Sequence, residues 1–141
     1  MTVPANSLAL LPLQGAMYQA IKADPGLDPL IGDRVYDEPP ESASYPYVVI
    51  GEAVETPDNE VAAYASRVAA TLHVWSAYQG FREALDIAGH LVRLFDHQPL
   101  TVPGRGVVAV RHEQTVTLRD PDSDLRHVVI RFAADTHPIT T

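Results

Sequence analysis

The chain contains no cysteine. This absence excludes disulfide bonds, catalysis by a cysteine thiolate, and zinc or iron–sulfur sites that depend on cysteine ligands. It assigns no redox compartment by itself.

Positive charge is also scarce. The 10 Lys and Arg residues face 18 Asp and Glu residues, which leaves a formal net charge of −8. Proteins that hold nucleic-acid phosphates or anionic membrane surfaces do so through cationic side chains. We therefore expect neither kind of binding through the overall field of the molecule, although DNA could pass nearby without being held.

Long apolar runs are missing as well. No run approaches the roughly 18 residues that span a bilayer. The N-terminal stretch MTVPANSLALLPLQG has no cationic leader, and Pro12 interrupts its apolar part, so no signal peptide is expected. We expect a soluble protein made inside the cell. Its 141 residues, 46% hydrophobic and 20% charged, predict a single domain over residues 1–141.

The first part of the chain predicts one helix and a connector. Apolar residues at helical spacing predict a helix over residues 10–23: Leu10, Leu13, Met17, Ala20 and Ile21. The sequence DPG that follows ends it. Residues 25–46 are rich in proline and glycine and are expected to be a connector with one short extended piece at residues 34–36, since Pro39 and Pro40 disfavour a central strand.

The middle of the chain predicts a hairpin followed by a second helix. Strands are expected at residues 47–55 and 67–75, joined by a long loop at 56–66. In the second strand Val68, Ala70, Leu72 and Val74 are expected on the buried face, opposite Arg67, Thr71 and His73. Ser76 and Gln79 match a capping box, which predicts a helix directly after the strand. Its buried side is expected to hold Phe81, Ala84, Leu85, Ala88, Leu91, Val92 and Phe95.

The last part predicts two more strands, at residues 107–118 and 125–134, separated by the turn sequence RDPDSD. Val128, Ile130 and Phe132 are expected to be buried, with Arg126 interrupting that face. The stretch HQPLTVPGRG before them is expected to be a turn-rich loop. The predicted fold class is α+β: an antiparallel sheet of about four strands with two helices packed on one face, in the order α-β-β-α-β-β.

Candidate chemical sites are weak. His73, His112, His127 and His137 suggest a metal cluster, but no H-x-H or H-E-x-x-H spacing supports one, and solvent-facing or interfacial imidazoles are the expected reading. The GRG sequence around Arg105 lacks the third glycine of a nucleotide loop. The acidic pairs Asp37 with Glu38 and Asp122 with Asp124 lie in polar loops where nothing tunes a pKa. No catalytic, cofactor-binding or metal residue is predicted, and no cofactor.

Trp75 allows two interpretations. It falls on the strand face opposite the Val and Leu row, beside Arg67 and His73. Either strand twist tucks it against the second helix, or it anchors a protein interface, where tryptophan is enriched.

Several stretches in order resemble a known family. They are SLALLPLQGAMYQAIKAD, LIGDRVY, YPYVV, RVAATLHVWSAY with its Ala- and Leu-rich continuation, and RHVVIRF. Over nearly the whole chain this succession is similar to the tail terminator, or tail completion, family of long-tailed bacteriophages, with relatives in prophages and gene transfer agents.

The resemblance implies a structural virion protein and no enzyme. It implies a homo-hexameric ring on the head-proximal end of the tail tube, in contact with the tube protein and with a head-completion or stopper protein of the neck. DNA would pass through its lumen without specific binding, and the −8 charge favours a lumen rich in Asp and Glu. Assembly would take place in the host cytoplasm, with no membrane or small-molecule partner.

A closed ring needs contacts between unlike patches of neighbouring subunits. The candidate patches are the tip of the 56–66 hairpin, the outward sheet face and the PGRG loop, with the interface residues Asp58, Tyr64, Arg67, His73, Trp75 and Arg105. Two alternatives stay open. One is another neck component, such as an adaptor or stopper, or a tail tube protein. The other is a small enzyme or ligand-binding domain.

Overall fold

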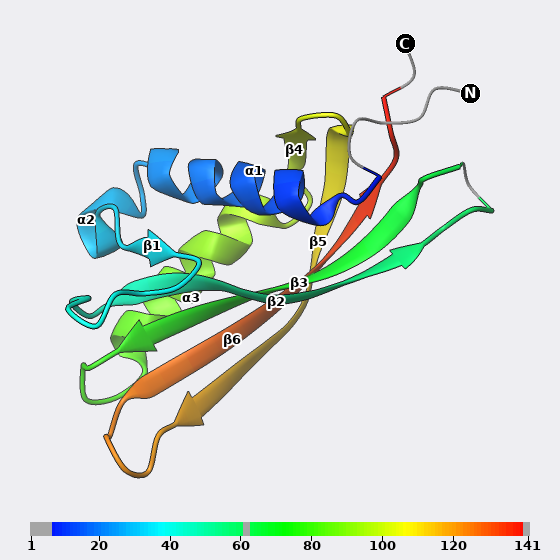
Figure 1. Ribbon diagram of the computed structural model, residues 1–141. Helices are drawn as coiled ribbons and strands as arrows, with labels where there is room; N and C mark the ends of the chain where they lie inside the picture. Colours follow the sequence, from blue (N-terminus) through cyan, green and yellow to red (C-terminus); the bar gives the residue numbers. More distant parts are fainter. Residues whose placement is uncertain (1–6, 61–62, 140–141) are drawn as a thin grey trace.

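The computed structural model describes residues 7–60 and 63–139, which form helices lying against one twisted sheet (Figure 1). The described strands make a six-stranded sheet in the order β1-β2-β3-β6-β5-β4. The elements along the chain are α1 (Leu10–Ala23), α2 (Asp28–Ile31), β1 (Val35–Tyr36), β2 (Tyr47–Pro57), β3 (Ser66–Ser76), α3 (Arg82–Phe95), β4 (Pro99–Val102), β5 (Gly106–Arg119) and β6 (Arg126–Thr136).

The predicted fold class is wrong in strand number, strand direction and element order. The sheet is mixed, because β1 pairs with β2 in parallel, while its other pairs are antiparallel. The two strands left out of the predicted count lie at the sheet edges, and β1 coincides with the short extended piece predicted at residues 34–36. β1 has only two residues, and β4 begins at a proline inside the stretch predicted as a loop. Prolines are tolerated at such edges, so their presence hid short strands from the sequence pattern.

The long strands follow their predicted alternation. Val68, Leu72 and Val74 of β3 are fully buried, and so are Val128, Ile130 and Phe132 of β6, as the sequence predicts. These rows share one core with α1 and α3. The opposite row of side chains on each strand points away from that core, because successive residues of a strand face opposite sides.

Helix α1 has its predicted bounds, and its start is held from a distant strand. Pro12 lies in the first turn, where a missing N–H costs nothing. No side chain of its N-cap residue, Ala9, caps the helix. Instead, the backbone N–H of Ala9 donates to both carboxylate oxygens of Glu55 on β2, at 3.0 Å each. A carboxylate at this end is favoured by the helix dipole. At the other end, Asp24 adopts an extended conformation and stops the helix.

Helix α3 begins later than predicted. Ser76 is the last residue of β3, and the helix starts at Arg82, so the predicted capping box is wrong. The Ser76 hydroxyl accepts from the N–H of Tyr78 and donates to the carboxylate of Glu83 at 2.7 Å. On the buried side of α3, Ala84, Ala88, Leu91 and Phe95 are buried as predicted. Leu85 is exposed against prediction, and Ile87 is buried in its place.

The sheet twist separates the two long hairpins in space. The β2–β3 hairpin extends to the right in Figure 1, past the start of α1, and the β5–β6 hairpin extends downward at the left. Within the described part of the chain, every helix is too short or too polar to cross a bilayer.

Candidate functional site

One face of the sheet carries none of the described helices, and one end of this face is aromatic. A single rung crosses four strands there, because Tyr47 pairs with Trp75, Trp75 with His127, and His127 with Leu118. The ring of Trp75 stacks on that of His127, with centroids 3.8 Å apart and planes 11° apart. Trp75 therefore lies on the outward face of the sheet, where it stacks on His127. Its role as an interface anchor remains a prediction.

An imidazole chain continues from this stack. His73 Nδ1 lies 2.7 Å from His127 Nε2, and His73 Nε2 lies 3.0 Å from a carboxylate oxygen of Glu52. When His73 is neutral and donates its Nε2 proton to the carboxylate, its Nδ1 can only accept. His127 must then donate from Nε2. In this arrangement His127 donates to His73, and His73 donates to Glu52.

Burial and neighbouring groups determine whether His127 and Glu52 are charged. Desolvation first, and then the proximity of His73, lower the pKa of His127 to about 4, while the Glu52 charge acts in the opposite direction. Burial acts to raise the pKa of Glu52, but its own backbone hydrogen bond and His73 outweigh that effect and leave the pKa below its usual value. His127 is therefore neutral at pH 7.

A bulge in β2 makes room for the hydrogen-bonded side chains of Glu52, His73 and His127. The β2–β3 register shifts between Ile50 and Ala53, and Gly51 lies in this irregularity. A Cβ at Gly51 would stand 2.5 Å from the His73 ring, closer than atoms can approach. Glycine is thus required for His73 to reach Glu52. A glycine within a predicted strand signals such a bulge, and this signal could have pointed to Glu52, which the predicted interface lacks.

The other end of the same face is charged. Arg67 on β3 donates to Asp135 on β6 at 2.8 Å, and Arg111 on β5 lies 3.3 Å from the second oxygen of the same carboxylate. All three side chains are about half exposed. They remain available to a partner, since pairs this exposed are held only weakly.

The predicted hairpin residues lie at the base of the β2–β3 loop, whose residues 61–62 are outside the described part. The N–H of Asp58 donates to the carbonyl of Ala65 at 2.7 Å and closes the loop. Tyr64 has a positive φ of 62°, and its carbonyl accepts from Arg105. Both side chains are half-buried.

Arg105 lies inside the molecule instead of on its surface, with 1% of its area exposed. Its guanidinium donates to the carbonyls of Tyr64 and Ser7, the latter at 2.6 Å, and to the Thr136 hydroxyl at 3.5 Å. The flanking glycines adopt positive φ, which lets the turn fold this side chain inward. Arg105 is therefore not part of the proposed contact surface.

Other polar candidates make local contacts on the surface. The part of the chain that the structure describes holds no group of three or more His, Asp or Glu side chains placed for a metal ion. His112 bonds Thr115 on its own strand. Asp124 pairs with Arg119 and Arg126, whose hydrogen bonds lower its pKa. These are surface ion pairs of a hairpin turn.

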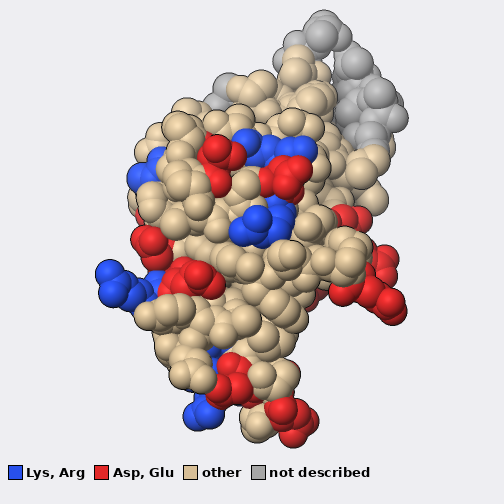
Figure 2. Space-filling view, turned by 90° about the vertical axis from the view of Figure 1, so that its left-hand side faces the viewer, with Lys and Arg blue, Asp and Glu red and all other residues tan. Residues whose placement is uncertain are grey.

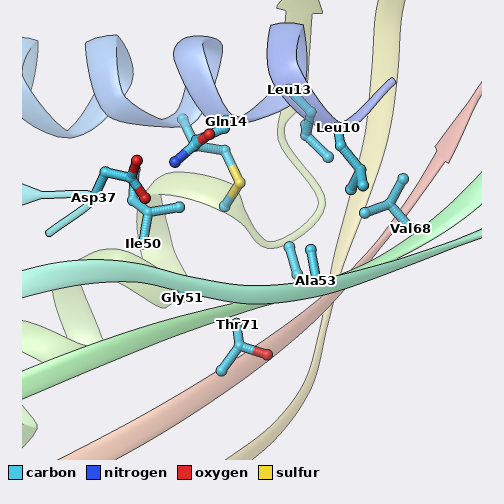
Figure 3. Close-up of a pocket in the computed structure, with 11 residues that line it drawn as sticks. Leu10, Leu13, Gln14, Asp37, Ile50, Gly51, Ala53, Val68 and Thr71 are labelled. Carbon is cyan, nitrogen blue, oxygen red and sulfur yellow. The ribbon is translucent and has the colours of Figure 1, made fainter. Parts of the chain in front are cut away.

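A groove runs between α1 and the bulged part of β2 (Figure 3). Its volume is about 240 Å³, and Leu10, Leu13 and Gln14 reach into it from α1 while Asp37 lies at its rim. Ala53 lines it from below, and Val68 lines it from the side, next to Leu10. The lining is mostly apolar and lacks the converging polar groups of a small-molecule site.

Surface charges on another side are mixed in sign. Figure 2 shows the side that carries α2 and the β5–β6 turn, where Lys and Arg alternate with Asp and Glu. No broad basic area of the kind that nucleic acids require is present on this side.

Comparison with known proteins gives consistent results. A family model described as tail completion protein gp17 matches residues 15–137. The tail completion protein gp17 of Bacillus phage SPP1 is 27% identical over 99 residues, which cover 70% of this chain and 73% of that protein. Both matches are described as tail completion proteins.

Solved structures show the same fold. A chain in the virion of a native gene transfer agent particle matches with a TM-score of 0.81 at 23% identity, over 93% of this chain and 98% of that one. The gp17 protein of bacteriophage SPP1 matches with a TM-score of 0.58 at 21% identity, over 96% and 98%. Because the family model covers most of the chain, this protein belongs to the tail completion protein gp17 family.

Proposed function

We propose that this protein is a tail terminator. Six copies form a closed ring on the head-proximal end of a tail tube, stop the addition of tube subunits, and present a surface to the neck of the head. The observation that carries the proposal is the match of residues 15–137 to the tail completion family. The fold shared with a chain of a gene transfer agent virion supports it.

The helix-free sheet face is the contact surface in this proposal. Trp75 supplies a flat aromatic area and Arg67 an exposed guanidinium, the residue types that dominate protein interfaces. His73 holds the stack in position. Asp58 and Tyr64 lie at the base of the β2–β3 loop, beyond Arg67 at the other end of the face. Contacts of this kind fit an assembly protein that performs no chemistry.

A reconstituted tail tests the function. Tube protein polymerising alone should give filaments of uncontrolled length, and addition of this protein should cap them at one end, visible as a ring in electron micrographs. Filaments that grow unchanged in its presence contradict the proposal. If the purified protein itself polymerises into open-ended filaments, it is a tube protein.

Variants distinguish whether the sheet face contacts the tail tube or a neighbouring copy in the ring. Trp75→Ala and Arg67→Ala should each weaken capping. If rings still form but tubes are not capped, the face contacts the tube; if rings are lost, it contacts a neighbouring copy. Leu85→Ala, on the exposed side of α3, is the matched control and should cap normally. Normal capping by both sheet-face variants contradicts the assignment of this face.

A further inference from the structure

The sheet has two partly open edges at opposite corners. On one side, β1 covers only Val48 and Val49 of β2, so no described strand pairs with residues 51–57 there. On the other side, β4 covers β5 only up to Ala109, and residues 96–97 bond to β5 at Val110 and His112. Residues 113–119 therefore have no described strand on that side. Open edges are templates for pairing with another chain.

The open segments carry exposed apolar side chains on the same face of the sheet. Val54 of β2 is 63% exposed and Leu118 of β5 is 46% exposed. Val54 pairs with Ala69, and Leu118 pairs with His127, both in the outward-facing rows. Charged residues and Pro57 flank these positions, but exposed apolar side chains on an open strand edge still favour pairing with another chain.

From these edges we propose that neighbouring copies in the ring join by strand addition, with residues 51–57 of β2 pairing with residues 113–119 of the next copy's β5. This rests on the proposed ring. Strand direction supports it, because three antiparallel steps separate β2 from β5 within one chain. A copy related by rotation about an axis running roughly along the strands therefore presents β5 antiparallel to β2.

The stagger between the two open segments fits ring closure. Through Ala69, Val54 is level with Ala133 of β6, whereas Val116 is level with Val129 and Leu118 with His127. Along the sheet, Val54 is therefore offset by four residues from Val116 and by six from Leu118. The offset must be even, because an odd one would turn each side chain to the wrong face. At ~3.3 Å per residue it amounts to ~13 or ~20 Å, over a width of ~19 Å for four strands. The resulting strand tilt of about 35° or 46° is close to the 35–45° of closed barrels.

The groove beside α1 fits the same pairing. It lies on the inner side of β2's open segment, between that strand and Leu10, Leu13 and Gln14. Thr115 and Thr117 occupy the inner row of β5. After strand addition these short side chains of the next copy would lie over the groove, where larger ones would meet α1.

Cysteine cross-linking tests the proposal without interference, because the native chain has no cysteine. Val54→Cys should form disulfides between copies when combined in one chain with Val116→Cys or Leu118→Cys, for offsets of four and six respectively. Three strand spacings separate these positions within one chain, about 14 Å before the offset is added. A disulfide needs Cα atoms within about 7 Å, so the bond must join two copies.

The matched control is Val54→Cys with Thr117→Cys, which puts the second thiol on the opposite face of the same edge. For one of the two outer-face pairs we expect a series of disulfide-linked species from dimer up to hexamer. The yield of cross-linked protein should be at least tenfold higher than for the control pair. Rings with no cross-link, or with equal cross-linking for both faces, overturn this inference and leave the proposed function standing. If the native protein forms no ring on tail tubes, the ring itself is refuted and this pairing with it.

Discussion

At the scale of single residues, the imidazole chain couples stability to pH. The pKa of His127 in the folded protein is about 4, below the 6.5 of a free histidine. Between pH 6.5 and pH 4, His127 is therefore protonated in the unfolded protein but neutral in the folded protein. The free energy of unfolding falls as the pH drops from about 6.5 to about 4. Allowing for solvent screening, the loss should be about 1–2 kcal/mol from this group.

His127→Phe checks this assignment, because phenylalanine can still stack on Trp75 but does not titrate. Urea unfolding at pH 7 and pH 5 should show a smaller stability loss in the variant than in the native protein. His73 and Glu52 face the same group and remain in both proteins. Identical losses would show that folding leaves the pKa of His127 unchanged, and would contradict this assignment.

Arg105 should be the most sensitive arginine for stability. Its removal leaves the partly buried carbonyls of Tyr64 and Ser7 without their donor. We expect Arg105→Ala to cost about 2–4 kcal/mol of unfolding free energy. Arg105→Lys should also be destabilising, because an ammonium group cannot span the same acceptors. Thermal unfolding followed by circular dichroism measures both. Arg82→Ala, at an exposed site, should stay within about 0.5 kcal/mol of the native protein.

At the scale of elements, a chain of hydroxyls joins strands that are distant in sequence. Ser66 donates to Glu55 at 2.7 Å, so the 2.9 Å bond to Thr136 must use the Thr136 proton. Thr136 in turn accepts from Arg105. Glu55 also holds the start of α1. One polar network thus ties the first helix, the β2–β3 hairpin and the last strand together at the same end of the sheet.

The β2 bulge gives a test at this scale. Gly51→Ala should destabilise the protein by about 1–3 kcal/mol, because the added methyl group overlaps the His73 ring. Gly89→Ala is the matched control on α3. Nothing lies within 4 Å of its Cβ position, so it should stabilise by about 0.5–1 kcal/mol. Chemical denaturation of both variants decides the matter, and equal effects of one sign would contradict the role of the bulge.

Long elements could be predicted from sequence, whereas the short extended piece at residues 34–36 is not counted as a strand and β4 is predicted as a loop. Val68 to Val74 and Val128 to Phe132 alternate over enough residues to identify their buried face. β1 and β4 are too short to show any period, and prolines beside them favour loops. The start of α3 was missed because Ser76 and Gln79 imitate a capping box while the strand continues through Ser76.

The candidate site shows the same division. Trp75, His73 and Arg67 could be assigned to one face from strand alternation alone, and the structure agrees. The approach of Glu52 depends on the bulge at Gly51, and the burial of Arg105 depends on carbonyls from residues 41 and 98 positions away. Contacts of that range leave no local pattern.

At the scale of the whole molecule, the net charge of −8 should keep DNA from binding. Non-specific binding requires cationic side chains that release counterions from the phosphates. We expect dissociation constants weaker than ~10⁻⁴ M for duplex DNA at physiological salt. Fluorescence anisotropy with a labelled duplex measures this. Micromolar binding that weakens steeply with salt would contradict a lumen through which DNA slides freely.

The central claim is that this protein ends tail growth and joins tail to head. The most direct measurement is the length of tails in electron micrographs of particles from a producer strain that lacks this gene. The account predicts overlong tails beside full heads that are not joined to them, and recovery on supplying the native protein. Tails of normal length on normal particles would contradict it.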